Sequence, residues 1–491
     1  RTSQEEQMVR RTSGRAVRDG EGFVARHVGT FTSILAVTAL LLAGIATADP
    51  GGEAAARTTR GVSQDSIRVV LYLPREDDPV NQIVQGFVAP TDSPAEIEAT
   101  IQGLVGLFEA NLSPELPRVE LITYIGTGSI LDSVAARADA VTIAEELEPF
   151  MVWSGPLLGS AFADELAARG VMCIQCITSA TDDFYAEHAP YVWSLQPTPD
   201  QVGTHVAEYI DKRLVGRPAS FAGDPEFTST ARRFGLIFMD GPYVGGGMHE
   251  AITDKLDDVG VELATAVGYS DPISVRQVQS TLIGRLKDAG VTTVIYAGDP
   301  LALRAFMAEA SAQEYHPEWL MTGVFTSEFT AFARDYDPNQ MRSAFGITPL
   351  PSDPKTYVGA LYEIFYGEPP PASESLLQLF APPALFYAAL RLVGPSITPE
   401  RFAQALFDAP ALGGDATNAA IPLIDFGTDT WTLPDYAGID DFTEIWWDAD
   451  FEGPDERGRE GRGRWEFANG GLRYRPGTWP EGPPDVFGAG T

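Results

Sequence analysis

Short apolar runs alternate with helical patterns along this chain, and no other feature limits the possible folds as much. The first run, residues 67–73, is almost continuously apolar and lies between Ser66 and Pro74. Such a run is typical of a strand buried on both faces of a parallel sheet. Strand–helix alternation at this spacing predicts right-handed βαβ units, with helices covering both faces. The sequence therefore predicts an α/β protein built on doubly wound parallel sheets.

The alternation falls into two successive series, which predicts two lobes. In the first series we expect strands at 67–73, 119–124, 150–153, 171–177 and 191–195, and helices at 132–146 and 161–169. In the second we expect strands at 234–239, 261–269, 292–297 and 318–322, and helices at 200–214, 246–259, 275–289 and 301–313. Residues 452–490 are rich in Gly, Pro and Arg. We expect them to be irregular and to pack Trp465, Tyr474 and Trp479 on a lobe, with a flexible tail as the alternative.

The composition is strongly acidic. The 491 residues include 34 Lys+Arg and 68 Asp+Glu, which gives a formal net charge of −34. Proteins that bind nucleic acids need a basic face that neutralises phosphates, and anionic membrane surfaces attract basic segments. We therefore expect no nucleic-acid partner and no docking on an anionic membrane surface.

The first 48 residues have the pattern of an export signal. Five arginines between residues 10 and 26 precede an apolar run at 34–45, which ends in the small-x-small site Ala46-Thr47-Ala48. We expect a cleaved signal peptide and a location in the cell envelope, outside the cytoplasm. The alternative is an uncleaved membrane anchor, because residues 28–48 are long enough to span a bilayer. Ile45 stands where a lipoprotein needs its cysteine, which excludes a thioether lipid anchor there.

Sequence motifs of catalytic chemistry are absent. The chain has no H-E-x-x-H, no G-x-S-x-G and no Walker loop, and its five histidines are scattered. Cys173 and Cys176 fall in an expected strand, where Cα atoms three residues apart lie ~10 Å from each other. A disulfide reaches only ~7 Å, so buried thiols are the first interpretation and a disulfide through a bend the second. We expect no enzyme, no cofactor and no metal site.

Several segments stand in an order that is familiar from one protein family. Residues 61–69 read GVSQDSIRV, Gly170-Val171 leads into Thr178-Ser179-Ala180-Thr181, residues 238–245 read FMDGPYVG, and a helix-and-strand pattern covers 278–295. Over roughly residues 61–480 this order resembles the Leu/Ile/Val-binding family of ABC-transporter solute-binding proteins, which have the type I periplasmic binding fold. The closing segment 470–477, GGLRYRPG, resembles actinobacterial members.

The resemblance implies two doubly wound parallel-sheet lobes joined by a three-strand hinge, with ligand bound between them. We expect the crossovers near residues 195–199, 321–324 and 434–441. The expected organisation is a signal peptide or anchor at 1–48, a first lobe at 61–196 and 323–436, a second lobe at 197–322, and a second-lobe tail with an irregular C-terminal segment at 437–491. Closure about a hinge is an established motion of periplasmic binding proteins, and the chain is expected to be a monomer.

The family's ligand contacts carry over only in part. The resemblance implies contacts from the turn after the third strand, the loop after the fourth, and one second-lobe aromatic residue: Trp153, Ser154, Ser160; Thr178, Ser179, Thr181; and Tyr243. The family's acidic partner for a ligand ammonium falls near Arg276, which favours a carboxylate or other anion. Asp271 could serve instead if the loop shifts. For each of these side chains an ordinary turn or cap role is the alternative.

The resemblance also implies a function. It predicts the extracytoplasmic solute-binding component of an ABC importer, which binds a small polar solute, an amino acid, carboxylate or amide-like molecule, and delivers it to a permease in the membrane. One alternative is a ligand-sensing receptor domain of the same fold without transport. An enzyme or a structural envelope protein is the other.

Overall fold

A five-stranded parallel sheet forms the centre of the first lobe. The computed structural model describes residues 59–78, 92–112, 116–156, 159–177, 180–241, 246–352, 354–414 and 421–488. The strand order is β2-β1-β3-β4-β5, with β1 paired to β2 and β3. The bounds are β1 Ser66–Leu73, β2 Arg118–Ile125, β3 Met151–Trp153, β4 Met172–Ile174 and β5 Val192–Trp193. This is the doubly wound order in which ligands bind beyond the carboxyl ends of the strands.

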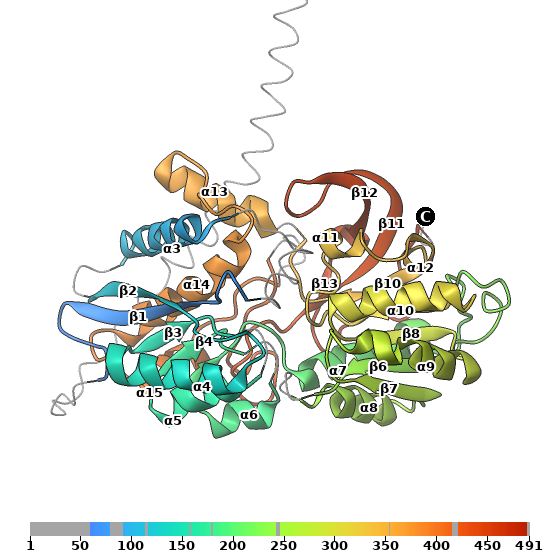
Figure 1. Cartoon of the computed structure of the whole chain (residues 1–491), viewed down its shortest axis with the longest axis horizontal. Helices are drawn as coiled ribbons and strands as arrows, with labels where there is room; N and C mark the ends of the chain where they lie inside the picture. Colours follow the sequence, from blue (N-terminus) through green and yellow to red (C-terminus); the bar gives the residue numbers. More distant parts are fainter. Residues whose placement is uncertain are drawn as a thin grey trace, which may run out of the picture.

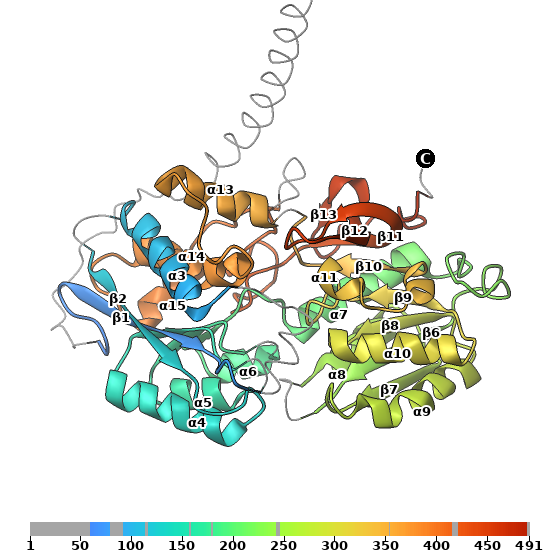
Figure 2. The ribbon, with the colours of Figure 1, turned by 45° about the horizontal axis from the view of Figure 1, so that its top comes forward.

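Side-chain alternation along β1 builds two cores, one on each face of the first sheet. Ile67, Val69 and Leu71 pack into one core, and Val70 and Tyr72 into the other. The first core is covered by α3 Pro94–Glu109, α13 Pro354–Tyr366, α14 Leu376–Val393 and α15 Pro399–Phe407 (Figure 2). The second is covered by α4 Ser133–Thr142, the π-helical turn Ile143–Leu147, α5 Ala161–Ala168 and α6 Asp182–Glu187.

The second lobe is built on an eight-stranded mixed sheet. Its order is β12-β11-β10-β9-β8-β6-β7, with β13 paired to β11, and the strands from β6 to β10 are parallel. The bounds are β6 Phe234–Met239, β7 Thr265–Tyr269, β8 Thr293–Ala297, β9 Glu318–Met321, β10 Ala344–Thr348, β11 Phe442–Pro454, β12 Glu460–Phe467 and β13 Arg473–Tyr474. The two lobes lie side by side (Figure 1).

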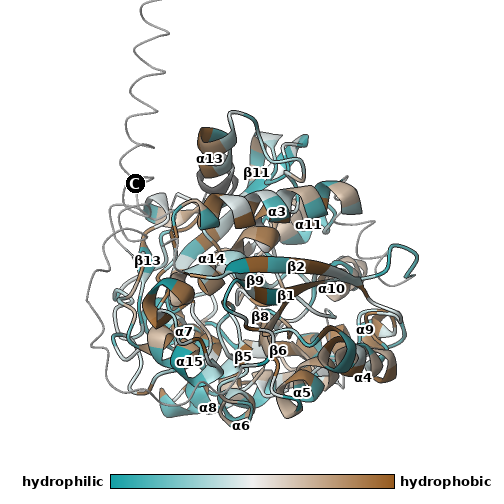
Figure 3. Cartoon of the chain, turned by 90° about the vertical axis from the view of Figure 1, so that its left-hand side faces the viewer, coloured by the Kyte–Doolittle hydropathy of each residue, from teal (hydrophilic) through white to brown (hydrophobic). Residues whose placement is uncertain are grey.

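Helices also cover both faces of the second sheet. One face carries α7 Pro199–Tyr209, the π-helical turn Ile210–Leu214 and α8 Met248–Asp258. The other carries α9 Val275–Asp288, α10 Pro300–Ala312, α11 Thr330–Ala333 and α12 Pro338–Met341. In Figure 3 strand β1 is largely hydrophobic while the outer helix α8 is largely hydrophilic, as packing in layers requires.

Two expectations from the sequence are corrected at the C-terminal end of the second sheet. Strands β11, β12 and β13 are antiparallel, so this sheet is mixed rather than purely parallel. Residues 452–467 were expected to be irregular, yet they form most of the β11–β12 hairpin. The aromatic residues do pack as expected: Trp465, Tyr474 and Trp479 are buried.

The second crossing between the lobes lies later in the chain than the sequence predicts. Residues from 323 were expected to return to the first lobe near 321–324, but β10 pairs with β9 in the second sheet. The chain therefore leaves the second lobe only after Thr348. The first and third of the predicted crossings lie side by side: Ser194 N donates to Tyr436 O at 2.8 Å, and Gly438 N donates to Ser194 O at 3.0 Å.

Within the described residues, no helix is long and apolar enough to cross a membrane. The predicted signal peptide or anchor, residues 1–48, lies outside the described part of the chain.

Candidate functional site

Left-handed backbone conformations gather at the carboxyl ends of the parallel strands. Ser154 follows β3 with φ +67°, and Gln175 follows β4 with φ +62°. In the second lobe, Phe325 and Thr326 follow β9 with φ +53° and +56°. Each such residue costs of order 1–3 kcal/mol and persists where the surrounding structure enforces it, often at binding sites. These strand ends are also where open α/β sheets bind ligands.

The loops beyond the strand ends of the two lobes meet at Thr181 and Gly247. Thr181 caps α6 through a hydrogen bond from Phe184 N at 3.3 Å, and Gly247 precedes α8 with φ +82°. A methyl group at Gly247 would lie 2.5 Å from Cγ2 of Thr181. Glycine is therefore required twice here, by its backbone conformation and by the close approach of the other lobe. Segments that follow parallel strands of both sheets therefore meet at this contact.

Of the three predicted ligand contacts after β3, one is buried in the core and two are half-buried. Trp153 is fully buried and packs edge-on against Phe386 at 5.6 Å, so its ring is part of the first-lobe core. Its indole Nε1 has no hydrogen-bond partner. Ser154 is half-buried at the strand end, and its carbonyl lies 3.3 Å from Sγ of Cys176. The hydroxyl of Ser160, at the start of α5, donates to Asp164 Oδ2 at 3.0 Å.

The structure does not bring the other predicted contact residues together in the part of the chain that it describes. Thr178, Ser179 and Tyr243 lie outside them. Arg276 is exposed on the first turn of α9. Asp271 accepts hydrogen bonds from Ile273 N, Ser274 N and the Ser274 hydroxyl, so it holds the start of α9. Burial raises the pKa of Asp271, but these hydrogen bonds outweigh it and the net pKa is lowered.

The structure also reveals a polar cluster at the strand ends of the second lobe that the sequence analysis missed. Asp299 caps α10 through Leu301 N and Ala302 N, and its other carboxylate oxygen accepts from Tyr269 Oη at 2.5 Å. Burial raises the pKa of Asp299. The sequence signal was present, because Asp299-Pro300 is the usual start of a helix, with the cap before a first-turn proline. The bonds already made by Asp299 give it a structural role.

The two cysteines are free and buried, in agreement with the first interpretation from the sequence. Burial, together with the neighbouring Cys173, raises the pKa of Cys176 well above its usual value. A thiol of this kind is a poor nucleophile, since the thiolate is the reactive form. Among the described residues, no group of three or more His, Cys, Asp or Glu side chains could hold a metal ion.

Comparison with known proteins identifies the fold. No family model and no curated protein matches the sequence. A solute-binding protein of an ABC transporter from Rhodopseudomonas palustris HaA2, solved with p-hydroxybenzoic acid, has a TM-score of 0.55 at 12% identity and covers 87% of this chain and 100% of its own. A fatty acid ABC transporter substrate-binding protein from Thermomonospora curvata has a TM-score of 0.53 at 14% identity, covering 86% and 98%.

A third similar structure is the closed conformation of a leucine-, isoleucine-, valine-, threonine- and alanine-binding protein from Brucella ovis. Its TM-score is 0.55 at 13% identity, and the match covers 85% of this chain and 98% of that chain. The chain therefore has the fold of type I periplasmic solute-binding proteins, as the sequence predicted. Function within a shared fold is decided by the site.

Proposed function

We propose that this protein is the extracytoplasmic solute-binding component of an ABC importer, and that it binds a small carboxylate-bearing solute between its lobes. The fold supports the binding mode. The solutes named for similar structures, p-hydroxybenzoic acid, fatty acid and branched-chain amino acids, share a carboxylate. A permease in the membrane would be the partner of the loaded form.

The contact between Thr181 and Gly247 is the observation that carries the proposal. It joins a loop after β4 in the first lobe to a loop after β6 in the second, so a solute bound beside this contact would touch both lobes. Such a solute binds the closed arrangement more tightly than an open one and shifts the population toward it. From the first lobe, Ser154 and Thr181 would contact it, together with Thr178 and Ser179 from the sequence prediction. From the second lobe, the sequence predicts a contact by Tyr243. Arg276 would contact it only if α9 approaches the site.

A thermal-shift screen tests ligand binding directly. The full chain is heated with benzoate, fatty acids and branched-chain amino acids, and with the primary amide of each, which lacks the carboxylate charge. A solute present at about 100 times its Kd should add about 2.7 kcal/mol to the free energy of unfolding, and the matching amide should add less. If only the amides stabilise the protein, the proposed recognition of a carboxylate is wrong. If no compound in the screen stabilises the protein, the proposed class of solute is wrong.

Two neighbouring glycines provide a matched test of the lobe contact. Gly246→Ala and Gly247→Ala both place an alanine at positive φ, but only the second methyl group meets Thr181. Gly247→Ala should therefore weaken binding of a screened ligand at least about tenfold more than Gly246→Ala, a difference of about 1.4 kcal/mol. Thr181→Ser removes Cγ2 and keeps the capping hydroxyl, so adding it to Gly247→Ala should restore affinity. Equal affinities in the two glycine variants place the ligand elsewhere.

A further inference from the structure

The turn that joins β11 to β12 reaches from the second lobe toward the first (Figure 1). We call this turn, residues 455–459, the hairpin tip. The pairing of β11 with β12 shifts register between Asp448 and Glu452, and a shift of this kind bends a strand. Because β11 also pairs with β10, the hairpin belongs to the second sheet, while its tip contacts the first lobe.

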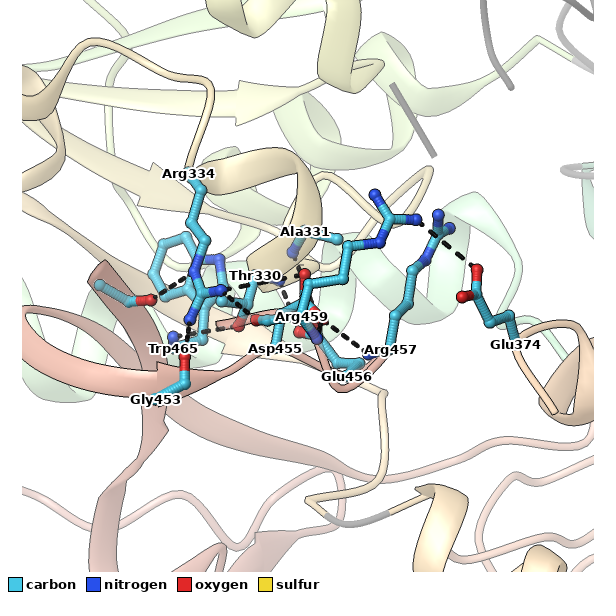
Figure 4. Close-up of polar contacts among 11 residues, drawn as sticks. Thr330, Ala331, Arg334, Glu374, Gly453, Asp455, Glu456, Arg457, Arg459 and Trp465 are labelled. Atoms are coloured by element: carbon cyan, nitrogen blue, oxygen red, sulfur yellow. Dashed lines mark hydrogen bonds and ion pairs between the residues drawn. The ribbon is translucent and has the colours of Figure 1, made fainter. Parts of the chain in front are cut away.

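The hairpin tip is fixed firmly to the second lobe. Arg334 donates to three carbonyl oxygens of the hairpin. The Glu456 carboxylate accepts from two backbone N–H groups at the start of α11, at 2.5 and 3.2 Å (Figure 4). Asp455 Oδ1 accepts from Arg457 N at 2.9 Å and Arg459 N at 3.0 Å, and Asp455 Oδ2 lies 3.9 Å from Arg334 Nη1. Both acidic residues of the tip therefore bind groups of the second lobe, and the backbone of the tip is held in place.

A carboxylate of the first lobe meets this tip. Arg459 Nη2 lies 3.6 Å from Glu374 Oε2, and the glutamate side chain is only 14% exposed (Figure 4). Glu374 precedes α14 on a segment that the first lobe holds on both sides. Ala372 is fully buried in the first core, and Ser375 N donates to Asp92 Oδ2 at 2.7 Å. Because each partner of the ion pair is held by its own lobe, the pair depends on how the two lobes are placed.

Arg457 adds a second positive charge at the same place. Its guanidinium lies beside that of Arg459 (Figure 4), and its Nη1 is buried without a hydrogen-bond partner. Burial lowers the pKa of Arg457 and the charge of Arg459 lowers it further, while Glu374, Asp455 and Glu456 oppose both effects. Of these three carboxylates only Glu374 belongs to the first lobe. Without it, two neighbouring guanidinium groups would be partly desolvated against the first lobe with no opposite charge on that side.

We propose that the hairpin tip is an electrostatic latch between the lobes, in which Arg459 and the adjacent Arg457 are attracted to Glu374. The latch forms when the lobes approach each other and breaks when they separate, so it favours the arrangement of the lobes seen here. A partly exposed ion pair contributes little free energy, which suits a contact that has to break whenever the lobes separate. The latch acts on the lobes themselves and does not depend on the solute proposed to bind between them.

Double electron-electron resonance on the full chain, without any ligand, tests the latch. Spin labels are attached through Val134→Cys in α4 of the first lobe and Val278→Cys in α9 of the second, since both positions are exposed. The native Cys173 and Cys176 are fully buried and should not be labelled. The measurement gives the fraction of molecules that have the interlobe distance of this structure and the fraction in which the lobes have separated.

Variants of the ion pair should shift this distribution. Glu374→Gln and Arg459→Gln should each raise the ratio of separated to joined lobes by about two- to fivefold, the effect of a partly exposed ion pair. The double variant should show no further increase, because either change removes the same interaction. Sodium chloride at about 0.5 M should shrink the difference between Glu374→Gln and the unmodified chain, because it screens the pair. Arg462→Gln is the matched control, since Arg462 lies in the same hairpin and pairs with Asp450 at 2.7 Å within the second lobe.

Three results would overturn the proposal. The first is a distance distribution that is the same in Glu374→Gln, Arg459→Gln and the unmodified chain. The second is an effect of the two changes that adds up in the double variant, and the third is an equal shift in Arg462→Gln. If Glu374→Gln does not fold, Arg459→Gln against Arg462→Gln still decides the question. Because no ligand is added, failure of the solute screen leaves this test unaffected.

Discussion

Arg473 shows how much a single side chain contributes to the connection between the lobes. Its Nε donates to Asp441 Oδ1 at 2.7 Å, next to the third crossing, and its Nη1 and Nη2 donate to Leu350 O and Pro349 O on the second crossing. Burial lowers the pKa of Arg473, and the Asp441 carboxylate opposes that effect. Two of the three crossings are thus held by one planar guanidinium.

Replacement of Arg473 by lysine should be strongly destabilising although the charge is kept. A lysine ammonium cannot reproduce a planar fork that reaches two segments at once. We expect the free energy of unfolding to fall by about 3 kcal/mol, the lower end of the range for a broken buried ion pair, measured by urea denaturation. Arg475→Lys is the control, because Arg475 is exposed two residues away. If Arg473→Lys lowers the free energy of unfolding no more than Arg475→Lys does, Arg473 does not hold the two crossings together.

The sequence predicted where some residues lie relative to the strands but not what surrounds them. Ser154 directly follows β3 and Thr181 lies between β4 and α6, while their contact with a ligand stays a prediction. Trp153 is the last residue of β3, and its ring belongs to the core because α14 supplies Phe386 against it. That contact joins residues more than 200 positions apart, so local patterns carry no signal for it. The partners of Arg473 are also distant in the chain, at separations of 32, 123 and 124 positions.

At the scale of elements, the central strands and helices were predictable and the β11–β12 hairpin was not. Strand β6 occupies the residues expected, since six consecutive apolar or glycine residues mark it. Strand β12 reads EGRGRWEF, in which charges and glycines hide the strand pattern. Tertiary contacts stabilise this hairpin although its residues have a low strand propensity. Arg334 donates to Gly453 O, Arg459 O and Gly463 O and so joins both strands of the hairpin (Figure 4).

Removal of these contacts should loosen the hairpin more than the rest of the protein. In Arg334→Lys, one ammonium cannot reach three carbonyl groups, so we expect amide hydrogen exchange over residues 453–463 to quicken about tenfold, equivalent to about 1.4 kcal/mol of local stability. Exchange in β6 should change little. Arg342→Lys is the control, since Arg342 is exposed and pairs with Asp450 at 3.7 Å. Uniform acceleration of amide exchange across the second sheet, β6 included, would show that Arg334 supports the whole second lobe instead.

At the scale of the whole molecule, the two-lobed architecture followed from the double series of strands and helices, but the path between the lobes did not. Strand β10 reads AFGIT, and its short run with a central glycine resembles a loop as much as a strand. It is fully buried because β9 and β11 flank it. Its neighbours come from distant parts of the chain, so the position of the second crossing depended on tertiary structure.

The third crossing carries buried carboxyl groups that tie the stability of the whole protein to pH. Burial raises the pKa of Asp440 to about 9 and that of Asp435 to about 8, with nearby aspartates adding to both. Asp440 Oδ1 accepts from Trp431 Nε1 at 2.8 Å, while Oδ2 is buried without a partner. When the pKa of a carboxyl group is higher in the folded state than in the unfolded state, its protonation stabilises the folded state. This contribution to the free energy of unfolding is complete below the unfolded-state pKa and is lost as pH rises through the folded-state pKa.

We therefore expect the stability of the unmodified protein relative to Asp440→Asn to fall as pH rises from 5 to 9. Asparagine keeps the acceptor for Trp431 and has no proton to lose, so its variant should lack this part of the pH dependence. The difference should reach the order of 2 kcal/mol, because each proton of difference changes the free energy of unfolding by about 1.4 kcal/mol per pH unit at most. Urea denaturation at each pH measures it. Asp429→Asn, at an exposed position in the same segment, should follow the unmodified protein at every pH. A constant offset between Asp440→Asn and the unmodified protein would mean that Asp440 is ionised throughout this range in the folded state.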